Sequence, residues 1–259
     1  MNEFGIDSLQ YSAGQQITQA EVDQIAYIIL KSGVSSAGYQ QMTTPAYFQQ
    51  TMSTYQFFEP TIRLMKANGK PTGAYFFSFA WDRASAEYEA NLMCDSLDAL
   101  TDKPDFPIFL DWEKTGYEDY RRGAYEGCLY HGITPTAALV QAVTLGWKSV
   151  VESRGYRAGL YTSGSLASTL FGSSFIQQQR QAGLFYWESS WDISQPFMAC
   201  DVWQYKGDTS WNGVTVEFNR IMDDRIWSGG GGGSKIPIWL MLKIAQQRSD
   251  RSGKCTILL

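Results

Sequence analysis

Short apolar runs alternate with amphipathic stretches from Phe4 to about Glu188. The apolar runs contain many Ile, Val, Phe and Tyr residues, which is typical of buried β-strands. Strands that alternate with helices form parallel sheets through right-handed crossovers, so the pattern predicts an α/β barrel or an open α/β sheet. The later strands follow one another with little helix between them, and 259 residues suit one barrel. We therefore expect an irregular TIM-like β/α barrel. The expected strands are Phe4–Asp7, Tyr27–Lys31, Thr72–Phe79, Pro107–Glu113, Ala158–Thr162, Leu184–Glu188, Asp201–Tyr205 and Val214–Phe218, and the expected helices are Gln19–Ile25, Phe57–Ala67, Asp82–Leu100, Thr136–Ser153 and Ser165–Gln181.

Capping residues indicate where several of these helices begin or end. Thr18, followed three residues later by Glu21, has the pattern of a capping box. Asp82 is placed to cap the helix that follows it. The helix that ends at Ser153 has the clearest amphipathic pattern, and Gly155 provides its stop. These signals place helices between strands, as a barrel of this kind requires.

The run from Pro107 to Glu113 ends in two carboxylates. Side chains alternate along a strand, so we expect Asp111 and Glu113 on the same face as Phe109. The carboxyl ends of parallel strands are where such folds carry out chemistry, and burial beside a like charge raises the pKa of a carboxyl group. A carboxyl group of this kind can act as a general acid near neutral pH. The same pattern is also typical of a strand that simply ends in solvent, and the run alone leaves both interpretations open.

Composition argues against several classes of function. A net charge of −5 and a pI near 5.0 are unlike those of a nucleic-acid-binding domain. No strand is followed by a glycine-rich phosphate-binding motif, and no Cys or His spacing fits a metal site, so we expect no cofactor and no metal. His131 is the only histidine, and we expect it in a loop, without a role as a ligand or base. The four cysteines are expected to be reduced thiols.

The two ends of the chain give expectations about location and domain boundaries. Met1 to Gln10 contains no secretory signal, and no apolar run is long enough to span a membrane. We therefore expect synthesis in the cytoplasm as a soluble chain. Five glycines between Ser228 and Ser234 have the composition of a flexible linker, which we interpret as engineered. This divides the chain into a barrel at 1–227, a linker at 228–234 and an appended peptide at 235–259.

Four acidic residues are expected at or near the carboxyl ends of strands: Asp7, Asp111, Glu113 and Glu217. In a parallel barrel these ends meet at one mouth. A carboxylate cluster without a usable histidine, metal motif or nucleotide loop fits glycoside hydrolysis, in which one acid protonates the leaving oxygen and a second carboxylate stabilises or attacks the sugar cation. Aromatic rings suited to binding sugars fall at comparable positions, although each of them is equally suited to filling the core. They are Tyr75, Tyr161, Trp187, Trp191, Trp203 and Tyr205.

Seven short motifs occur in order along the expected strands. They are Gly5-Ile-Asp7, Gly73-Ala-Tyr75-Phe-Phe-Ser78, Pro107-Ile-Phe-Leu-Asp111-Trp-Glu113, Gly159-Leu-Tyr161-Thr162, Trp187-Glu-Ser-Ser-Trp191, Trp203-Gln-Tyr205 and Val216-Glu217-Phe-Asn219. In this order they resemble the strand motifs of the family 25 glycoside hydrolases, the muramidase-type lysozymes. The resemblance implies an irregular β/α barrel that cleaves the β-1,4 bond between N-acetylmuramic acid and N-acetylglucosamine in bacterial peptidoglycan. It also implies action on the cell wall, as in phage endolysins or tail-associated lysins.

The resemblance further implies a role for each acid. Glu113 would be the proton donor, Asp111 would position the substrate and stabilise the transition state, and Asp7 would hold the site together. Glu217 stands where the family motif Val-Asp-x-Asn has aspartate, and its extra methylene moves the carboxyl group by about one bond length, enough to change a rate. Trp191 also departs from the tyrosine usual in the family. Two other functions remain open on the same barrel, namely a catalytically weak protein that binds cell-wall glycan and a structural component of a phage tail.

Overall fold

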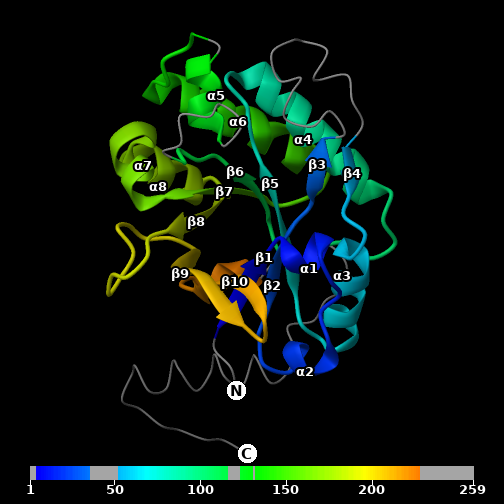
Figure 1. Ribbon diagram of the computed structural model, residues 1–259. Coiled ribbons are helices and arrows are strands. Elements are labelled where there is room, and N and C mark those ends of the chain that lie inside the picture. The colour runs from blue at the N-terminus through cyan, green and yellow to red at the C-terminus, as the bar shows by residue number, and fades with distance from the viewer. Residues whose placement is uncertain (1–3, 36–51, 116–122, 131, 228–259) are drawn as a thin grey trace, which may run out of the picture.

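The computed structural model describes residues 4–35, 52–115, 123–130 and 132–227. Eight strands form a closed barrel in the order β1-β10-β9-β8-β7-β6-β5-β2, with helices around it (Figure 1). The expected irregular β/α barrel is therefore confirmed. His131, the linker and the appended peptide lie outside the described residues. The barrel strands are β1 Gly5–Ser8, β2 Ile28–Lys31, β5 Thr72–Phe77, β6 Ile108–Asp111, β7 Ala158–Ser163, β8 Phe185–Ser189, β9 Val202–Trp211 and β10 Val214–Ile221.

The last strand makes the barrel irregular. All neighbouring pairs are parallel except the two that β10 makes, with β9 and with β1. The cause is the two-residue turn Asn212-Gly213, in which φ is 51° at Asn212 and 81° at Gly213. Positive φ at both positions is typical of a tight β-hairpin, which reverses the chain direction. The expectation that the last strand would present its carboxyl end with the others is therefore wrong.

Eight helices of the described residues lie outside the barrel, and α4 and α6 pack against each other (Figure 1). The capping box of Thr18 and Glu21 is present and Asp82 caps α4, both as expected. Thr136 caps α6. The long helix expected to end at Gln181 is divided, because Gly172 adopts a φ of 88°. The helices are α1 Gln10–Ala13, α2 Gln19–Val22, α3 Phe58–Ala67, α4 Arg83–Asp98, α5 Ala124–Tyr130, α6 Ala137–Ser153, α7 Gly164–Leu166 and α8 Ser173–Gln181, with a π-helix at Ala167–Phe171, a 3-10 helix at Asp224–Trp227 and a small hairpin of β3 Gly33–Ser35 and β4 Met52–Thr54.

Strand alternation produces two hydrophobic clusters. Ile28 and Leu30 on β2 belong to the larger cluster, which fills the space between the barrel wall and the helices. Ile29, between them, belongs to a smaller cluster inside the barrel, together with Phe109 and Trp187. Adjacent residues therefore face either the helices or the interior. The same alternation shows which polar side chains of the strands face the barrel interior and which face the helices.

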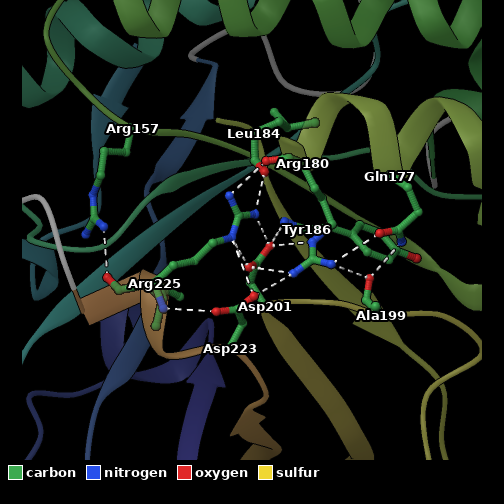
Figure 2. Close-up of polar contacts among 10 residues, drawn as sticks. Arg157, Gln177, Arg180, Leu184, Tyr186, Ala199, Asp201, Asp223 and Arg225 are labelled. Carbon is green, nitrogen blue, oxygen red and sulfur yellow. Dashed lines mark hydrogen bonds and ion pairs between the residues drawn. The ribbon is translucent and has the colours of Figure 1, made fainter. Parts of the chain in front are cut away.

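An ion-pair cluster holds the beginning of β9 (Figure 2). Asp201, which directly precedes β9, is fully buried and accepts a hydrogen bond from the Tyr186 backbone N–H at 2.7 Å. Its carboxylate also pairs with Arg180 from α8, at 3.0 Å, and with Arg225 from the C-terminal 3-10 helix. Asp223 pairs with Arg180 at 3.1 Å. These contacts tie α8, β8, β9 and the 3-10 helix together; we call these five residues the Asp201 cluster.

Candidate active site

Three acidic side chains point into the barrel. Asp7 is flanked by Ile6, which belongs to the outer hydrophobic cluster, so Asp7 faces the interior and is only 2% exposed. Asp111 is the last residue of β6, shares the face of Phe109 and is 4% exposed. Glu217 lies directly opposite Asp7 in the antiparallel pair of β1 and β10. Two sheet neighbours and the end of β6 thus direct carboxyl groups toward one region.

The position of Glu217 in the fold differs from the one predicted from the sequence. It lies within an antiparallel strand and not at the carboxyl end of a parallel one. The register between β10 and β9 shifts between Val216 and Phe218, on either side of Glu217. Such irregularities bend a strand and redirect its side chains, and they are common beside active sites.

Glu113 follows the end of β6 and is held by its buried neighbour Trp112. The Trp112 indole N–H donates to the Ala80 carbonyl at 3.0 Å, and its backbone N–H donates to the Tyr161 carbonyl at 3.1 Å. The carbonyl of Glu113 accepts from the Tyr125 N–H at 3.1 Å. Trp112 is fully buried on the helix side, so Glu113 returns to the side of Asp111.

The environment of Glu113 favours its protonated form near neutral pH. Burial raises its pKa to about 7, and the neighbouring Glu217 carboxyl group acts in the same direction. A hydrogen bond with the Tyr161 hydroxyl and the positive charge of Lys31 oppose this rise. A carboxyl group with this pKa can hold a proton and release it at neutral pH, as a general acid must.

Asp111 lies in the same electrostatic environment. Burial raises its pKa well above the ordinary value, the charge of Glu113 adds to the rise, and Lys31 opposes it. Its buried Oδ1 has no hydrogen-bond partner among the described residues. A buried oxygen of this kind is available to a bound ligand. We call Asp7, Asp111, Glu113 and Glu217 the carboxylate cluster.

Asp7 is the most heavily hydrogen-bonded member of the carboxylate cluster. Its Oδ1 accepts from Asn219 Nδ2 at 2.5 Å and from Gln204 Nε2 at 3.1 Å. Glu217, its register partner on β10, lies beside this carboxyl group. Burial raises the pKa of Glu217 to about 11, and the charge of Asp7 acts in the same direction.

Four of the six aromatic residues singled out from the sequence lie at or near the cluster. Burial and then the charges of all four carboxylates raise the pKa values of Tyr75 and Tyr161, which places both phenols beside the cluster. Trp187 is 1% exposed and lies under them, with ring centroids 4.4 Å from Tyr161 and 6.0 Å from Tyr75. Trp191 is 44% exposed, and its indole N–H donates to Gln204 at 2.9 Å. Trp191 therefore offers a ring face to solvent near the cluster.

Trp203 and Tyr205 are not brought to the carboxylate cluster. Strand alternation in β9 turns Gln204 inward, so its two neighbours face outward. Trp203 is buried in the outer hydrophobic cluster, and its indole N–H donates to the Ser190 carbonyl at 2.9 Å. Tyr205 packs on Trp203 and on Phe218, with ring centroids 5.7 and 6.4 Å away. The expectation that these two rings line the mouth is corrected accordingly.

Three polar residues beside the cluster were not predicted from the sequence: Lys31, Gln204 and Asn219. Lys31 ends β2 two residues after inward-facing Ile29, and its Nζ lies 4.6 Å from the centroid of the Phe77 ring. Burial lowers the pKa of Lys31, and the charges of the nearby carboxylates oppose this. Strand alternation was the signal that could have found all three, because each lies on the inward face of its strand.

Other features of the described residues bear on the remaining expectations. Cys94, Cys128 and Cys200 are buried, free thiols. Within the described ranges, no group of three or more His, Cys, Asp or Glu side chains is arranged to hold a metal ion. No helix of that part of the chain is long and apolar enough to cross a membrane.

Several solved structures share this fold. The endolysin ply40 from bacteriophage P40 of Listeria monocytogenes has a TM-score of 0.54 at 16% identity, over 87% of this chain and 96% of that one. The modular autolysin LytC from Streptococcus pneumoniae has a TM-score of 0.59 at 14% identity, over 84% of this chain and 46% of that one. The CTP1L endolysin has a TM-score of 0.56 at 17% identity, over 86% of this chain and 67% of that one. The chain thus spans about two thirds of the CTP1L endolysin and less than half of LytC.

The sequence itself identifies the family. No curated protein matches the chain. The sequence model of the glycosyl hydrolases family 25 matches residues 16–214, which include β2, β5 to β9 and the acids Asp111 and Glu113. The match covers well over half of the chain. The chain belongs to the glycosyl hydrolases family 25.

Proposed function

We propose that this glycoside hydrolase acts on bacterial cell-wall peptidoglycan and cleaves the β-1,4 bond between N-acetylmuramic acid and N-acetylglucosamine. The observation that carries the proposal is the carboxylate cluster, in which burial gives Glu113 a pKa of about 7. The substrate class is supported by similarity to LytC, whose structure is also known with a synthetic peptidoglycan ligand (TM-score 0.58, 15% identity). The two similar endolysins support action at the cell wall.

In the proposed reaction, Glu113 is the general acid. Its proton passes to the glycosidic oxygen as the bond from that oxygen to the sugar C1 breaks. Positive charge then develops on the sugar ring, and the Asp111 carboxylate stabilises it. A water molecule completes the hydrolysis, and the Glu113 carboxylate takes up its proton. Lys31 favours the ionised form of Asp111, because its positive charge opposes the rise of the pKa of that carboxyl group.

Asp7 and Glu217 form the other side of the proposed catalytic site. Asp7 is fixed by the amides of Asn219 and Gln204, so its carboxylate holds a constant position. We assign Glu217 to the catalytic site because it lies directly opposite Asp7 in the pairing of β1 with β10.

The proposed sugar contacts come from the aromatic residues near the cluster. Tyr75 and Tyr161 lie beside the carboxyl groups, and the Trp187 ring packs against both of their rings. Trp191 is the exposed ring, and its indole packs across Gly207, where an added Cβ would lie 2.4 Å from the ring. A flat, partly exposed indole on a fixed backbone is suited to stacking on a sugar ring. We therefore propose Trp191 as the platform for a sugar next to the cleaved bond.

The test removes the acid and keeps its shape. We expect Glu113→Gln to reduce release of reducing ends from purified peptidoglycan by at least about 100-fold, since general acid catalysis contributes factors of this size. Clearing of a bacterial wall suspension should fall in parallel, whereas wall binding in a pull-down should remain. Identification of the new reducing ends as N-acetylmuramic acid would establish the bond.

A matched control is Glu152→Gln, since Glu152 lies on α6 in an exposed ion pair with Lys148. This variant should release reducing ends at the rate of the parent. If Glu113→Gln releases them as fast as the parent, Glu113 is not the acid. If the parent binds walls and releases no reducing ends, the chain is a glycan-binding protein on a hydrolase barrel.

A further inference from the structure

Two tryptophans fix the orientation of the amides that contact Asp7. The Trp187 indole N–H donates to Asn219 Oδ1 at 2.8 Å, and the Trp191 indole N–H donates to Gln204 Oε1 at 2.9 Å. An indole nitrogen can only donate, so each amide must turn its oxygen to the indole and its NH₂ group to Asp7. The Tyr161 hydroxyl, 2.9 Å from Gln204 Oε1, is compatible with the same orientation. Asp7 therefore accepts two amide hydrogen bonds, which favour its ionised form.

The position of Glu217 beside Asp7 favours a proton on one of the two groups. The two residues are direct partners in the pairing of β1 with β10, so their carboxyl groups lie side by side. Two ionised carboxylates repel each other in this arrangement, whereas a protonated carboxyl group can donate a hydrogen bond to an ionised one. Since both amide donors point at Asp7, the proton belongs on Glu217.

We propose that Glu217 is a neutral carboxylic acid that donates a hydrogen bond to ionised Asp7, and that it acts as a positioning residue for Asp7. The longer side chain of glutamate lets the acid reach across the strand pair to Asp7. Under the proposed function, which this inference deepens, Asp111 is then the carboxylate that faces the sugar cation.

The charges around Glu217 agree with this assignment. The groups that act on it are Asp7 from β1, Asp208 from β9, Asp111 and Glu113 from the β6 end, and Lys31 from β2. All are acidic except Lys31, so ionisation of Glu217 would add a negative charge to an acidic surrounding. Burial acts first and these charges second, and together they raise the pKa of Glu217 to about 11.

Infrared spectroscopy tests the protonation of Glu217 without any assay of hydrolysis. At about pH 9, Glu113, with a pKa of about 7, is ionised. The parent protein should still show the carbonyl band of a protonated carboxylic acid, which shifts when glutamate is isotope-labelled. Glu217→Gln should lose this band, while Glu152→Gln keeps it. Absence of a protonated glutamate band in the labelled parent overturns the inference. This measurement uses only the parent protein, so it does not depend on whether a variant folds.

Kinetics give a second reading that a purely structural role would not produce. Glutamine can still donate an N–H to Asp7, so Glu217→Gln should lose about tenfold in kcat or less, whereas Asp7→Asn, which removes the charge, should lose about 100-fold or more. If Glu217→Gln is as inactive as Glu113→Gln while Glu217→Asp is active, an ionised carboxylate is needed at this position and the inference is wrong. If the parent hydrolyses no peptidoglycan, the proposed function fails, and the infrared result still decides the state of Glu217.

Discussion

Replacement of Asp201 by asparagine should destabilise the barrel without touching the carboxylate cluster. Asp201 is fully buried, and its two oxygens accept from Arg180, Arg225 and the Tyr186 N–H (Figure 2). Asparagine has nearly the same shape, but it carries no charge and has one acceptor oxygen in place of two. The variant therefore removes the buried anion that pairs with both arginines and leaves them the more exposed Asp223.

The size of the effect follows from the surroundings of the two arginines. Removal of one partner of a buried ion pair costs about 3–5 kcal/mol, because the other charge remains buried. Arg225 keeps hydrogen bonds to the Arg180 and Leu184 carbonyls, at 3.0 and 2.7 Å, and its side chain is 28% exposed. We therefore expect the lower end, about 3 kcal/mol, which corresponds to a fall of about 6–12 °C in Tm for a domain of this size.

The pH dependence of unfolding gives an independent measure of the same interaction. Burial alone would raise the pKa of Asp201, but the hydrogen bonds from Arg225, Arg180 and Tyr186 outweigh it, so the pKa is lowered. A carboxyl group with a lowered pKa in the folded state contributes stability above its unfolded pKa, about 3.9, and loses it as pH falls through the folded pKa. The difference in stability between parent and Asp201→Asn should therefore be constant above about pH 5 and shrink in more acidic buffer.

Asp223→Asn is the matched control. Asp223 pairs with Arg180 at 3.1 Å, but its side chain is 42% exposed, so its loss should cost less than about 1 kcal/mol. Chemical unfolding of the three proteins, followed by tryptophan fluorescence, gives the comparison. If Asp201→Asn unfolds at the same denaturant concentration as Asp223→Asn, the buried ion pairs do not hold the beginning of β9 and the reasoning is refuted.

Two further outcomes follow from the site and the core. Because Glu113, with a pKa of about 7, must be protonated to act as the acid, the initial rate of reducing-end release should fall as pH rises through about 7, and a rate that stays level to about pH 8.5 would contradict this role. Gly159→Ala should lower the free energy of unfolding, measured with denaturant, by about 1–3 kcal/mol, since the added Cβ would lie 2.3 Å from the Phe109 ring. The control Gly127→Ala in α5 meets nothing nearer than 4.0 Å and should be neutral or slightly stabilising. Equal stability of the two variants would argue against tight packing inside the barrel.

Much of the fold could be predicted from short sequence patterns. The capping box of Thr18 and Glu21 needs contacts only within one helical turn, and it is present. The apolar run before Asp111 forms β6, and alternation places Asp111 inside the barrel with Phe109. In each case the determining contacts lie within a few residues of one another, so the local sequence is enough to predict the element.

The parts that were missed depend on residues far apart in the chain. Asn219 and Gln204 contact Asp7 across separations of 212 and 197 residues, which no local pattern reveals. The outward position of Trp203 follows from simple alternation once Gln204 is known to face inward. The reversal of β10 had a local signal in Asn212-Gly213, a dipeptide that favours tight hairpins.

The reversal of β10 explains how the barrel tolerates Asp7 and Glu217 side by side. Directly opposed residues in an antiparallel pair have Cβ atoms about 4.5–5.5 Å apart, and like charges placed there are destabilising. Asn219 lies two residues beyond Glu217, on the same face of β10, and supplies a donor to Asp7. The strand thus brings both a second carboxyl group and an amide that favours charge on the first. The Asn219 amide stabilises a negative charge on Asp7 and not on Glu217. The repulsion between the two groups is removed when Glu217 keeps its proton. The geometry of the strand pair therefore favours Glu217 as the neutral partner.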